Sequence, residues 1–97
     1  MARVTRDPLA DRDLTEIATY IGEVNCSPDA ARRFLDQLNE KLKLYATQPE
    51  MGELRPDLAD GVRIFSFGNY VVVYRPLADG IDVLRIFEGH RDYPTLF

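Results

Sequence analysis

Residues 62–87 read VRIFSFGNYVVVYRPLADGIDVLRIF, a pattern that predicts three consecutive strands. The strands are expected at 62–67, 70–75 and 81–87, where β-branched and aromatic residues dominate. Gly68-Asn69 and Asp79-Gly80 stand at the joins, where hairpin turns need positive φ. Because residues 70–74 are apolar on both faces, the second strand is expected to be central and covered on both sides.

The first half of the chain predicts two helices. Asp7-Pro8 and Ser27-Pro28 each pair a capping residue with a proline at the first helical position. An apolar stripe follows each start, and Pro49 ends the second helix. The stripe residues are Leu14, Ile17, Ala18, Ile21 and Val24 in the first helix, and Ala31, Phe34, Leu35, Leu38, Leu42 and Tyr45 in the second.

A short connection joins these helices, so we expect an antiparallel hairpin with both stripes on one side. Residues 2–6 alternate weakly and predict a short first strand, and residues 49–60 have the composition of a loop. The resulting order is β-α-α-β-β-β. The sequence therefore predicts a single α+β domain over residues 1–97, with a helical hairpin packed on a small, mainly antiparallel sheet.

The charge distribution argues against tight, direct binding to nucleic acid. The formal net charge is −4. Residues 1–60 carry 8 Lys or Arg against 12 Asp or Glu, and residues 61–97 carry 4 against 4. Since proteins that bind phosphates usually present a basic face, no strong DNA or RNA contact is expected.

The sequence lacks the residue patterns of metal sites, nucleotide-cofactor sites and nucleophile–base pairs. One cysteine and one histidine do not make the usual zinc site, and no phosphate-cradling or dinucleotide motif occurs, so no metal and no cofactor are expected. Cys26 and His90 as a nucleophile–base pair have no supporting motif, and we interpret Cys26 as a small residue at a helix end. The charged N-terminus, the short apolar runs and the single cysteine predict a cytoplasmic protein without a membrane segment.

In order and spacing, the sequence resembles the ParE/RelE toxin superfamily over nearly the whole chain. The similar pieces are Ala10-x-x-x-Leu14-x-x-Ile17-x-x-Tyr20-Ile21, Ser27-Pro28-x-x-Ala31-x-x-Phe34-Leu35, Pro49-x-Met51-Gly52-x-x-Arg55, Gly61-Val62-Arg63, Tyr70-Val71-Val72-Val73-Tyr74-Arg75 and Val83-Leu84-Arg85-Ile86-Phe87-x-Gly89-His90-Arg91-Asp92. The resemblance implies a growth-arresting toxin that is neutralised by a co-encoded antitoxin, ParD-like or other. RelE-like members cut messenger RNA in the ribosomal A site, whereas ParE-like members are reported to poison DNA gyrase.

Departures from the RelE-like pattern favour the ParE-like branch. Arg63 stands where RelE-like enzymes place a lysine. Phe65 replaces their second lysine, and Val71 replaces an arginine of their central strand. Only Arg63, Arg91 and Tyr93 remain as catalytic candidates, too few cations to stabilise a developing phosphate charge. We therefore expect a protein-binding gyrase inhibitor. The alternatives are a ribosome-dependent mRNA endonuclease and a toxin-fold protein that has lost toxicity.

Two surfaces carry the predicted contacts. The resemblance implies that the tail 88–97 and the sheet face the target; the target-contact residues are Arg63, His90, Arg91, Tyr93 and Phe97. For Arg63 and Arg91, target contact and a purely structural role are equally favoured. For His90, a structural role is favoured over a role as a general base. Arg75 and Arg85 are interpreted as surface charges, or as partners of Asp82, Glu88 or Asp92.

The helices carry the predicted antitoxin contacts. Tyr20 sits at the edge of the first stripe, and Leu44 lies about 140° from the centre of the second at 100° per residue. The resemblance implies an antitoxin helix that wraps the toxin, and apolar anchors in a groove bind such helices. Tyr20 and Leu44 are therefore predicted to border that groove.

Overall fold

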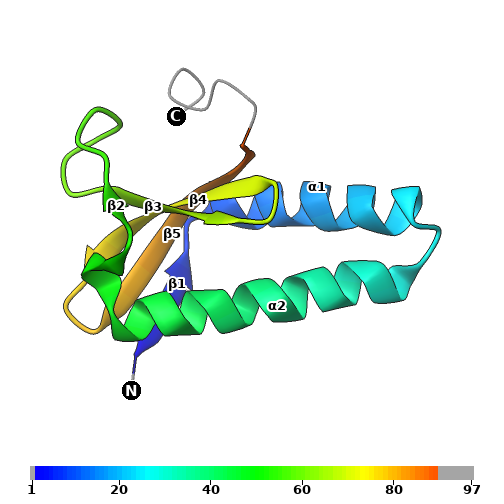
Figure 1. The fold of residues 1–97 in the computed structure, drawn as a ribbon, viewed down its shortest axis with the longest axis horizontal. Coiled ribbons are helices and arrows are strands. Elements are labelled where there is room, and N and C mark those ends of the chain that lie inside the picture. The colour runs from blue at the N-terminus through cyan, green and yellow to red at the C-terminus, as the bar shows by residue number, and fades with distance from the viewer. Residues whose placement is uncertain (1, 90–97) are drawn as a thin grey trace.

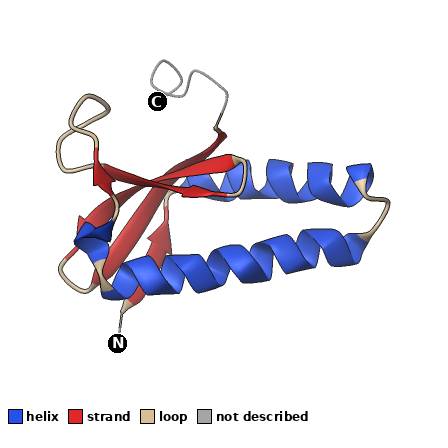
Figure 2. Ribbon diagram, viewed as in Figure 1, coloured by secondary structure: helices blue, strands red, loops and turns tan. Residues whose placement is uncertain are grey.

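Two helices pack on one side of a five-stranded sheet in the computed structural model, which describes residues 2–89 (Figure 1). The elements are β1 (Arg3–Arg6), α1 (Pro8–Val24), α2 (Pro28–Thr47), the 3-10 turn η1 (Pro49–Met51), β2 (Glu53–Leu54), β3 (Arg63–Phe67), β4 (Tyr70–Leu77) and β5 (Gly80–Glu88). The helices run antiparallel, and their connecting loop lies well beyond the edge of the sheet (Figure 2). The predicted α+β class and helical hairpin are confirmed.

The strands lie in the order β1-β5-β4-β3-β2. Neighbours from β2 to β5 are antiparallel, and β1 pairs with β5 in parallel. β4 is the middle strand, and Val71, Val72, Val73 and Tyr74 are buried, so the predicted central strand is confirmed. β4 continues past the expected end at Arg75. Pro76, which has no N–H to donate, is tolerated in this part of the strand because β3 stops opposite Tyr74 and no strand on that side needs a donor.

Alternation along the strands builds an apolar cluster on each face of the sheet. The larger cluster fills the space between helices and sheet, and contains Leu14, Leu38, Leu42, Phe65, Tyr74 and Val83 among others. The smaller one lies on the other face, where Val62, Ile64, Val71, Val73 and Phe87 are buried with help from Leu58 and Ala59 of the 55–62 segment. Most of both helical stripes thus turns to one side, as predicted, whereas Val24 at the end of the first stripe is 61% exposed.

The helix starts follow the sequence signals with one difference. The Asp7 carboxylate accepts a hydrogen bond from the Leu9 N–H at 2.9 Å, which caps α1 as expected. α2 begins after Ser27, but the Ser27 side chain makes no capping hydrogen bond. Cys26 lies at φ 50°, beyond the C-cap of α1, where the Cys26 and Ser27 N–H groups close the helix end on the Glu23 and Gly22 carbonyls.

The prediction of a plain loop over residues 49–60 was wrong. η1 and the two-residue strand β2 lie inside it, and β2 pairs with β3 through Glu53–Ile64 and Leu54–Arg63. No periodicity marks so short a strand in the sequence, because its pairing depends on side chains elsewhere that hold the segment.

The prediction of the second hairpin turn was also partly wrong. Gly68 has φ 58°, as expected of the first turn, but the second turn is formed by Ala78 and Asp79, and Gly80 does not have positive φ. Gly80 pairs with Arg3 of β1, and a Cβ at position 80 would overlap the Arg3 backbone. This glycine therefore serves the close approach of a parallel strand.

Candidate functional site

A groove lies between α1 and the last part of β5, beyond the point where β1 ends. Pairing of β1 with β5 stops at Arg6 and Val83, and the Asp7 N–H donates to the Val83 carbonyl at 2.8 Å as the chain turns into the helix. Residues 84–88 of β5 consequently have no strand neighbour on this side within residues 2–89, and α1 runs alongside them instead. This arrangement, an incomplete sheet edge beside a helix, positions the side chains of the site.

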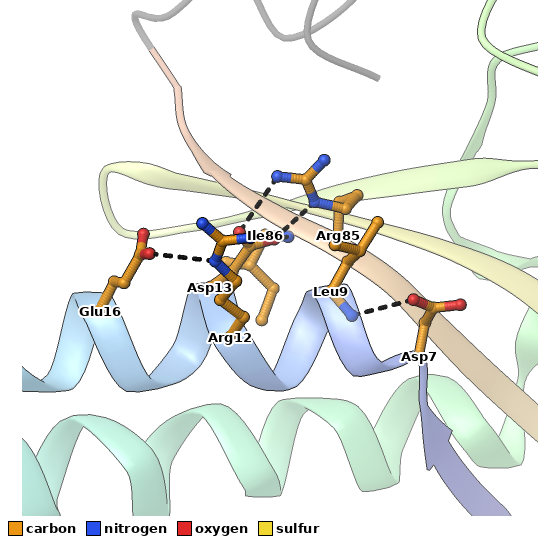
Figure 3. Close-up of polar contacts among 7 residues, drawn as sticks. All are labelled: Asp7, Leu9, Arg12, Asp13, Glu16, Arg85 and Ile86. Atoms are coloured by element: carbon orange, nitrogen blue, oxygen red, sulfur yellow. Dashed lines mark hydrogen bonds and ion pairs between the residues drawn. The ribbon is translucent and has the colours of Figure 1, made fainter.

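Asp13 ties α1 to this edge through three hydrogen bonds (Figure 3). Its carboxylate accepts from Arg85 Nε at 2.8 Å, from the second guanidinium nitrogen at 3.2 Å, and from the Ile86 backbone N–H at 2.9 Å. The Asp13 side chain is only 12% exposed, and the hydrogen bond to it raises the pKa of Arg85. Asp13 thus satisfies a strand N–H that β1 does not reach.

The groove has a volume of about 320 Å³ and mixed walls. Its apolar and aromatic lining comes from both elements, and its polar lining is mostly acidic; the residues are Asp13, Glu16, Ile17, Tyr20, Tyr70, Arg85, Ile86, Phe87 and Glu88. The Tyr20 side chain stands in the open, with 60% of its surface exposed. Burial raises the pKa of the Tyr70 hydroxyl, and the nearby Glu88 carboxylate and Tyr20 raise it further.

Acidic charge predominates around the groove. Asp13, Glu16 and Glu88 contribute three negative charges and Arg85 one positive charge, a formal sum of −2. Glu16 also lies 3.5 Å from Arg12, but both side chains are about two-thirds exposed or more, so this pair is screened by water. Arg85 is doubly occupied, by Asp13 and by the Phe87 ring, 4.6 Å from its guanidinium carbon. The site favours a cation over an anion.

The opposite edge of the sheet is closed by the chain itself. The Tyr74 hydroxyl accepts from the Gly52 N–H at 3.0 Å and donates to the Pro49 carbonyl at 2.7 Å. Arg63 donates to the carbonyls of Gly52 at 2.7 Å and Glu50 at 3.0 Å. A Cβ on Gly52 would overlap the Tyr74 ring, so only glycine fits. Arg63, half-buried, holds the 49–52 segment, which favours its structural interpretation.

The positions compared with RelE-like cations do not share a surface. Phe65 is buried between helix and sheet, where it stacks on Tyr45 at a centroid distance of 3.9 Å. Val71 belongs to the cluster on the other face of the sheet. Restoring cations at 65 and 71 would bury two charges on opposite faces, so these positions form no phosphate-binding pair in this chain.

The predicted contact residues fall into three groups. His90, Arg91, Tyr93 and Phe97 lie outside the described residues. Tyr20 lines the groove, whereas Leu44 is exposed in the last turn of α2. Leu44 does not line the groove that Tyr20 lines.

The two arginines interpreted as surface or paired charges have different environments. Arg75 is exposed, with no ion pair to any residue in the range 2–89. Arg85 is paired, as one interpretation had it, but its partner among residues 2–89 is Asp13 rather than Asp82 or Glu88, and Asp92 lies outside the described residues. The Asp82 carboxylate instead accepts a hydrogen bond from the Thr5 hydroxyl.

The sequence patterns did not predict that Asp13, Glu16, Tyr70 and Glu88 line one groove. A signal existed for Asp13, because Asp13, Ile17 and Tyr20 follow at i, i+4 and i+7 along one ridge of α1. A carboxylate on such a ridge indicates a partner on the surface against which the helix packs. Which strand residue supplies that partner depends on the sheet order, and the sequence does not give it.

Within residues 2–89, no group of His, Cys, Asp or Glu side chains is arranged to hold a metal ion. None of the helices in that range combines the length and the apolar composition that crossing a membrane requires.

Comparison with known proteins agrees with this geometry. The family model for the "ParE toxin of type II toxin-antitoxin system, parDE" matches residues 4–93. Among solved structures, the chain is similar to one described as "Chromosomal ParDE TA system from P. aeruginosa", with a TM-score of 0.72 and 23% identity over 91% of this chain and 96% of that chain. No curated protein gives a significant match in sequence.

Proposed function

This chain belongs to the ParE toxin family of type II toxin–antitoxin systems, and from that premise we propose that its target is DNA gyrase and that a cognate antitoxin, ParD-like or other, neutralises it in the cytoplasm. The family match over residues 4–93 carries the proposal. The toxin would act by binding, stabilising or blocking a gyrase–DNA state, and would make or break no bond itself.

The state of the sheet residues supports binding over bond chemistry. Hydrolysis of a phosphodiester needs cations placed at the developing charge. Arg63 is occupied with two backbone carbonyls, Phe65 is in the core, and the net charge is −4. Gyrase, rather than bare DNA, is consequently the partner that an acidic chain can approach.

The proposed target contacts lie at the tail. We assign His90, Arg91, Tyr93 and Phe97 to this surface because they follow β5 directly. Arg63 contributes through the 49–52 segment that it holds. Tyr20 and Leu44 are assigned to the antitoxin, which would cover two separate parts of the hairpin.

Gyrase supercoiling tests the proposal. Relaxed plasmid, ATP and gyrase are titrated with the purified chain, with and without its co-encoded antitoxin. We expect supercoiling to fall or cleaved DNA to accumulate, and the antitoxin to reverse the effect. If gyrase is unaffected by a folded chain, the gyrase proposal is wrong, and cleavage of ribosome-bound mRNA becomes the assay that tests the alternative.

Matched arginine variants locate the contact. Arg91→Ala, tested together with Tyr93→Ala, is expected to weaken gyrase inhibition at least about tenfold, the usual loss when a central interface side chain is truncated. Arg75→Ala is the control, since Arg75 is exposed on β4. Equal inhibition by all three variants would remove the tail from the proposed surface.

A further inference from the structure

The α1–β5 groove has features that the proposed gyrase contact does not use. Its volume of about 320 Å³ is at the lower end of the roughly 300–1,000 Å³ of small-ligand sites, which suits one long side chain and its neighbours. Tyr20 is 60% exposed at its mouth although tyrosine carries a large apolar ring. An exposed aromatic residue beside a groove is a usual feature of a binding surface.

The backbone chemistry of the groove decides how a partner could bind there. A partner strand adding to β5 would need the edge N–H groups of that strand. The Ile86 N–H already donates to Asp13 at 2.9 Å, and that carboxylate also holds Arg85. Adding a strand at this point would break all three hydrogen bonds. Recognition by an inserted side chain leaves them intact and is therefore favoured.

The groove also selects the charge of the inserted side chain. The formal charge of its lining is −2, and the Glu16 carboxylate lies on the α1 side. Tyr20 and Tyr70 present aromatic rings, whose faces attract cations, while Ile17 and Ile86 accept an aliphatic stem. Arginine and lysine combine such a stem with a cationic head.

We propose that the α1–β5 groove receives an arginine or lysine side chain from a short basic segment of the antitoxin. This inference rests on the proposed function, because it takes the antitoxin to be the partner. Nucleic acid is excluded as the occupant by the −2 lining, and a second copy of this chain is disfavoured because each copy carries −4. On this proposal, the antitoxin carries a positively charged segment that faces the toxin.

The test is the affinity of the full-length co-encoded antitoxin for variants of the full toxin, by calorimetry. Glu16→Lys reverses one groove charge, and Glu53→Lys on β2 makes the same change at the other end of the sheet order. We expect Glu16→Lys to weaken binding at least about tenfold, and Glu53→Lys to have less than about a third of that effect. Binding should also weaken as salt rises from about 50 to about 300 mM.

Two tyrosine variants test the aromatic part. Tyr20→Ala removes the ring and is expected to weaken binding about tenfold or more, whereas Tyr20→Phe keeps the ring face and should bind within about threefold of the wild type. Because Tyr20 is exposed, both variants should fold, and thermal unfolding checks this.

Each contrary result has its own meaning. Equal weakening by Glu16→Lys and Glu53→Lys would indicate only long-range charge and overturn the groove. Unchanged affinity of Glu16→Lys and Tyr20→Ala would also overturn the groove, while leaving the antitoxin as partner. A wild-type chain that binds no antitoxin would overturn the partner itself. Self-association that Tyr20→Ala abolishes would assign the groove to a second copy.

Discussion

The two edges of the sheet are completed in different ways. At the β2 edge, Tyr74 and Arg63 hold the 49–52 segment through neutral backbone groups, and Gly52 is packed so tightly that no Cβ fits. At the β5 edge, β1 ends at Arg6, opposite Val83, and a charged groove with an exposed tyrosine follows. The first edge is completed within the chain, and the second, on our proposal, is completed by a partner.

Because the two edges differ in this way, substitutions at the β2 edge should affect stability and substitutions in the groove should affect binding. Buried, neutral hydrogen bonds and close packing contribute to folding wherever they occur. Exposed charges and rings contribute little to folding but can dominate an interface. Four substitutions test this division, and their expected effect on the free energy of unfolding decreases from Gly52 to Leu44.

Gly52→Ala at the closed edge should have the largest effect. The new Cβ would overlap the Tyr74 ring and the Ile64 carbonyl, which pushes the segment away and breaks the Gly52 N–H hydrogen bond. We expect a loss of about 2–4 kcal/mol in unfolding free energy, measured by urea denaturation. Gly61→Ala is the control, with φ 73° but no atom near its Cβ, and should lose only about 1 kcal/mol. Equal losses would contradict the packing argument.

Asp13→Ala should show that the β5 edge also contains a contact that stabilises the fold. It leaves Arg85 and the Ile86 N–H without their acceptor in a site where Asp13 is 12% exposed. We expect a loss of about 2–3 kcal/mol. Asp11→Ala is the matched control on the same helix. The ion pair of Asp11 with Arg6 is about half exposed, so this variant should lose less than about 1 kcal/mol of unfolding free energy. Similar losses for both aspartates would mean that burial does not separate them.

Tyr74→Phe should separate the hydroxyl from the ring. The variant loses both hydrogen bonds of the Tyr74 hydroxyl but keeps the apolar ring, so we expect a loss of about 1–2 kcal/mol near neutral pH. Burial is the largest cause of the raised pKa of the Tyr74 hydroxyl. The folded state therefore favours the neutral phenol, whose contribution is complete below pH about 10 and is lost as pH rises through the higher folded pKa.

The measurement is urea denaturation of both proteins from neutral to alkaline pH. Wild type should lose stability above pH about 10 more steeply than Tyr74→Phe, because the variant lacks this titrating group. Tyr70, whose pKa is also raised, remains in both proteins and cancels in the difference. Parallel pH profiles would show that Tyr74 titrates no differently in the folded and unfolded states.

The outcome of the sequence predictions follows the same division. Periodicity and capping residues act locally, so the span of α1 from Pro8 and the central place of residues 70–74 were predictable. Contacts that depend on sheet order were not. Asp13 and Arg85 are 72 residues apart in sequence, and their pairing needs β5 to lie beside β1.

Two glycines illustrate the limit further. Gly68 was predictable because its positive φ is a local property of a hairpin turn. Gly80 was assigned to the same role and is instead required by the backbone of Arg3, which lies on a distant strand. Likewise β2 follows a segment that Tyr74 and Arg63 hold in place. Tyr20 was placed at the edge of a helical stripe, with no indication of the groove residues beside it.

Leu44→Glu should have the smallest effect on stability and decides how far the antitoxin extends beyond the β5 edge. Leu44 is 45% exposed, so we expect the unfolding free energy to change by less than about 0.5 kcal/mol. If the antitoxin wraps the hairpin, its affinity should fall about tenfold, because a carboxylate would be buried against an apolar anchor. Thr47→Glu, one turn further along α2 and also exposed, distinguishes a local contact from added charge. Unchanged affinity for Leu44→Glu, with affinity lost in Tyr20→Ala, would confine the antitoxin to the groove side of the hairpin. The antitoxin would then contact the helices only at the α1–β5 groove, and Leu44 would be an ordinary exposed leucine.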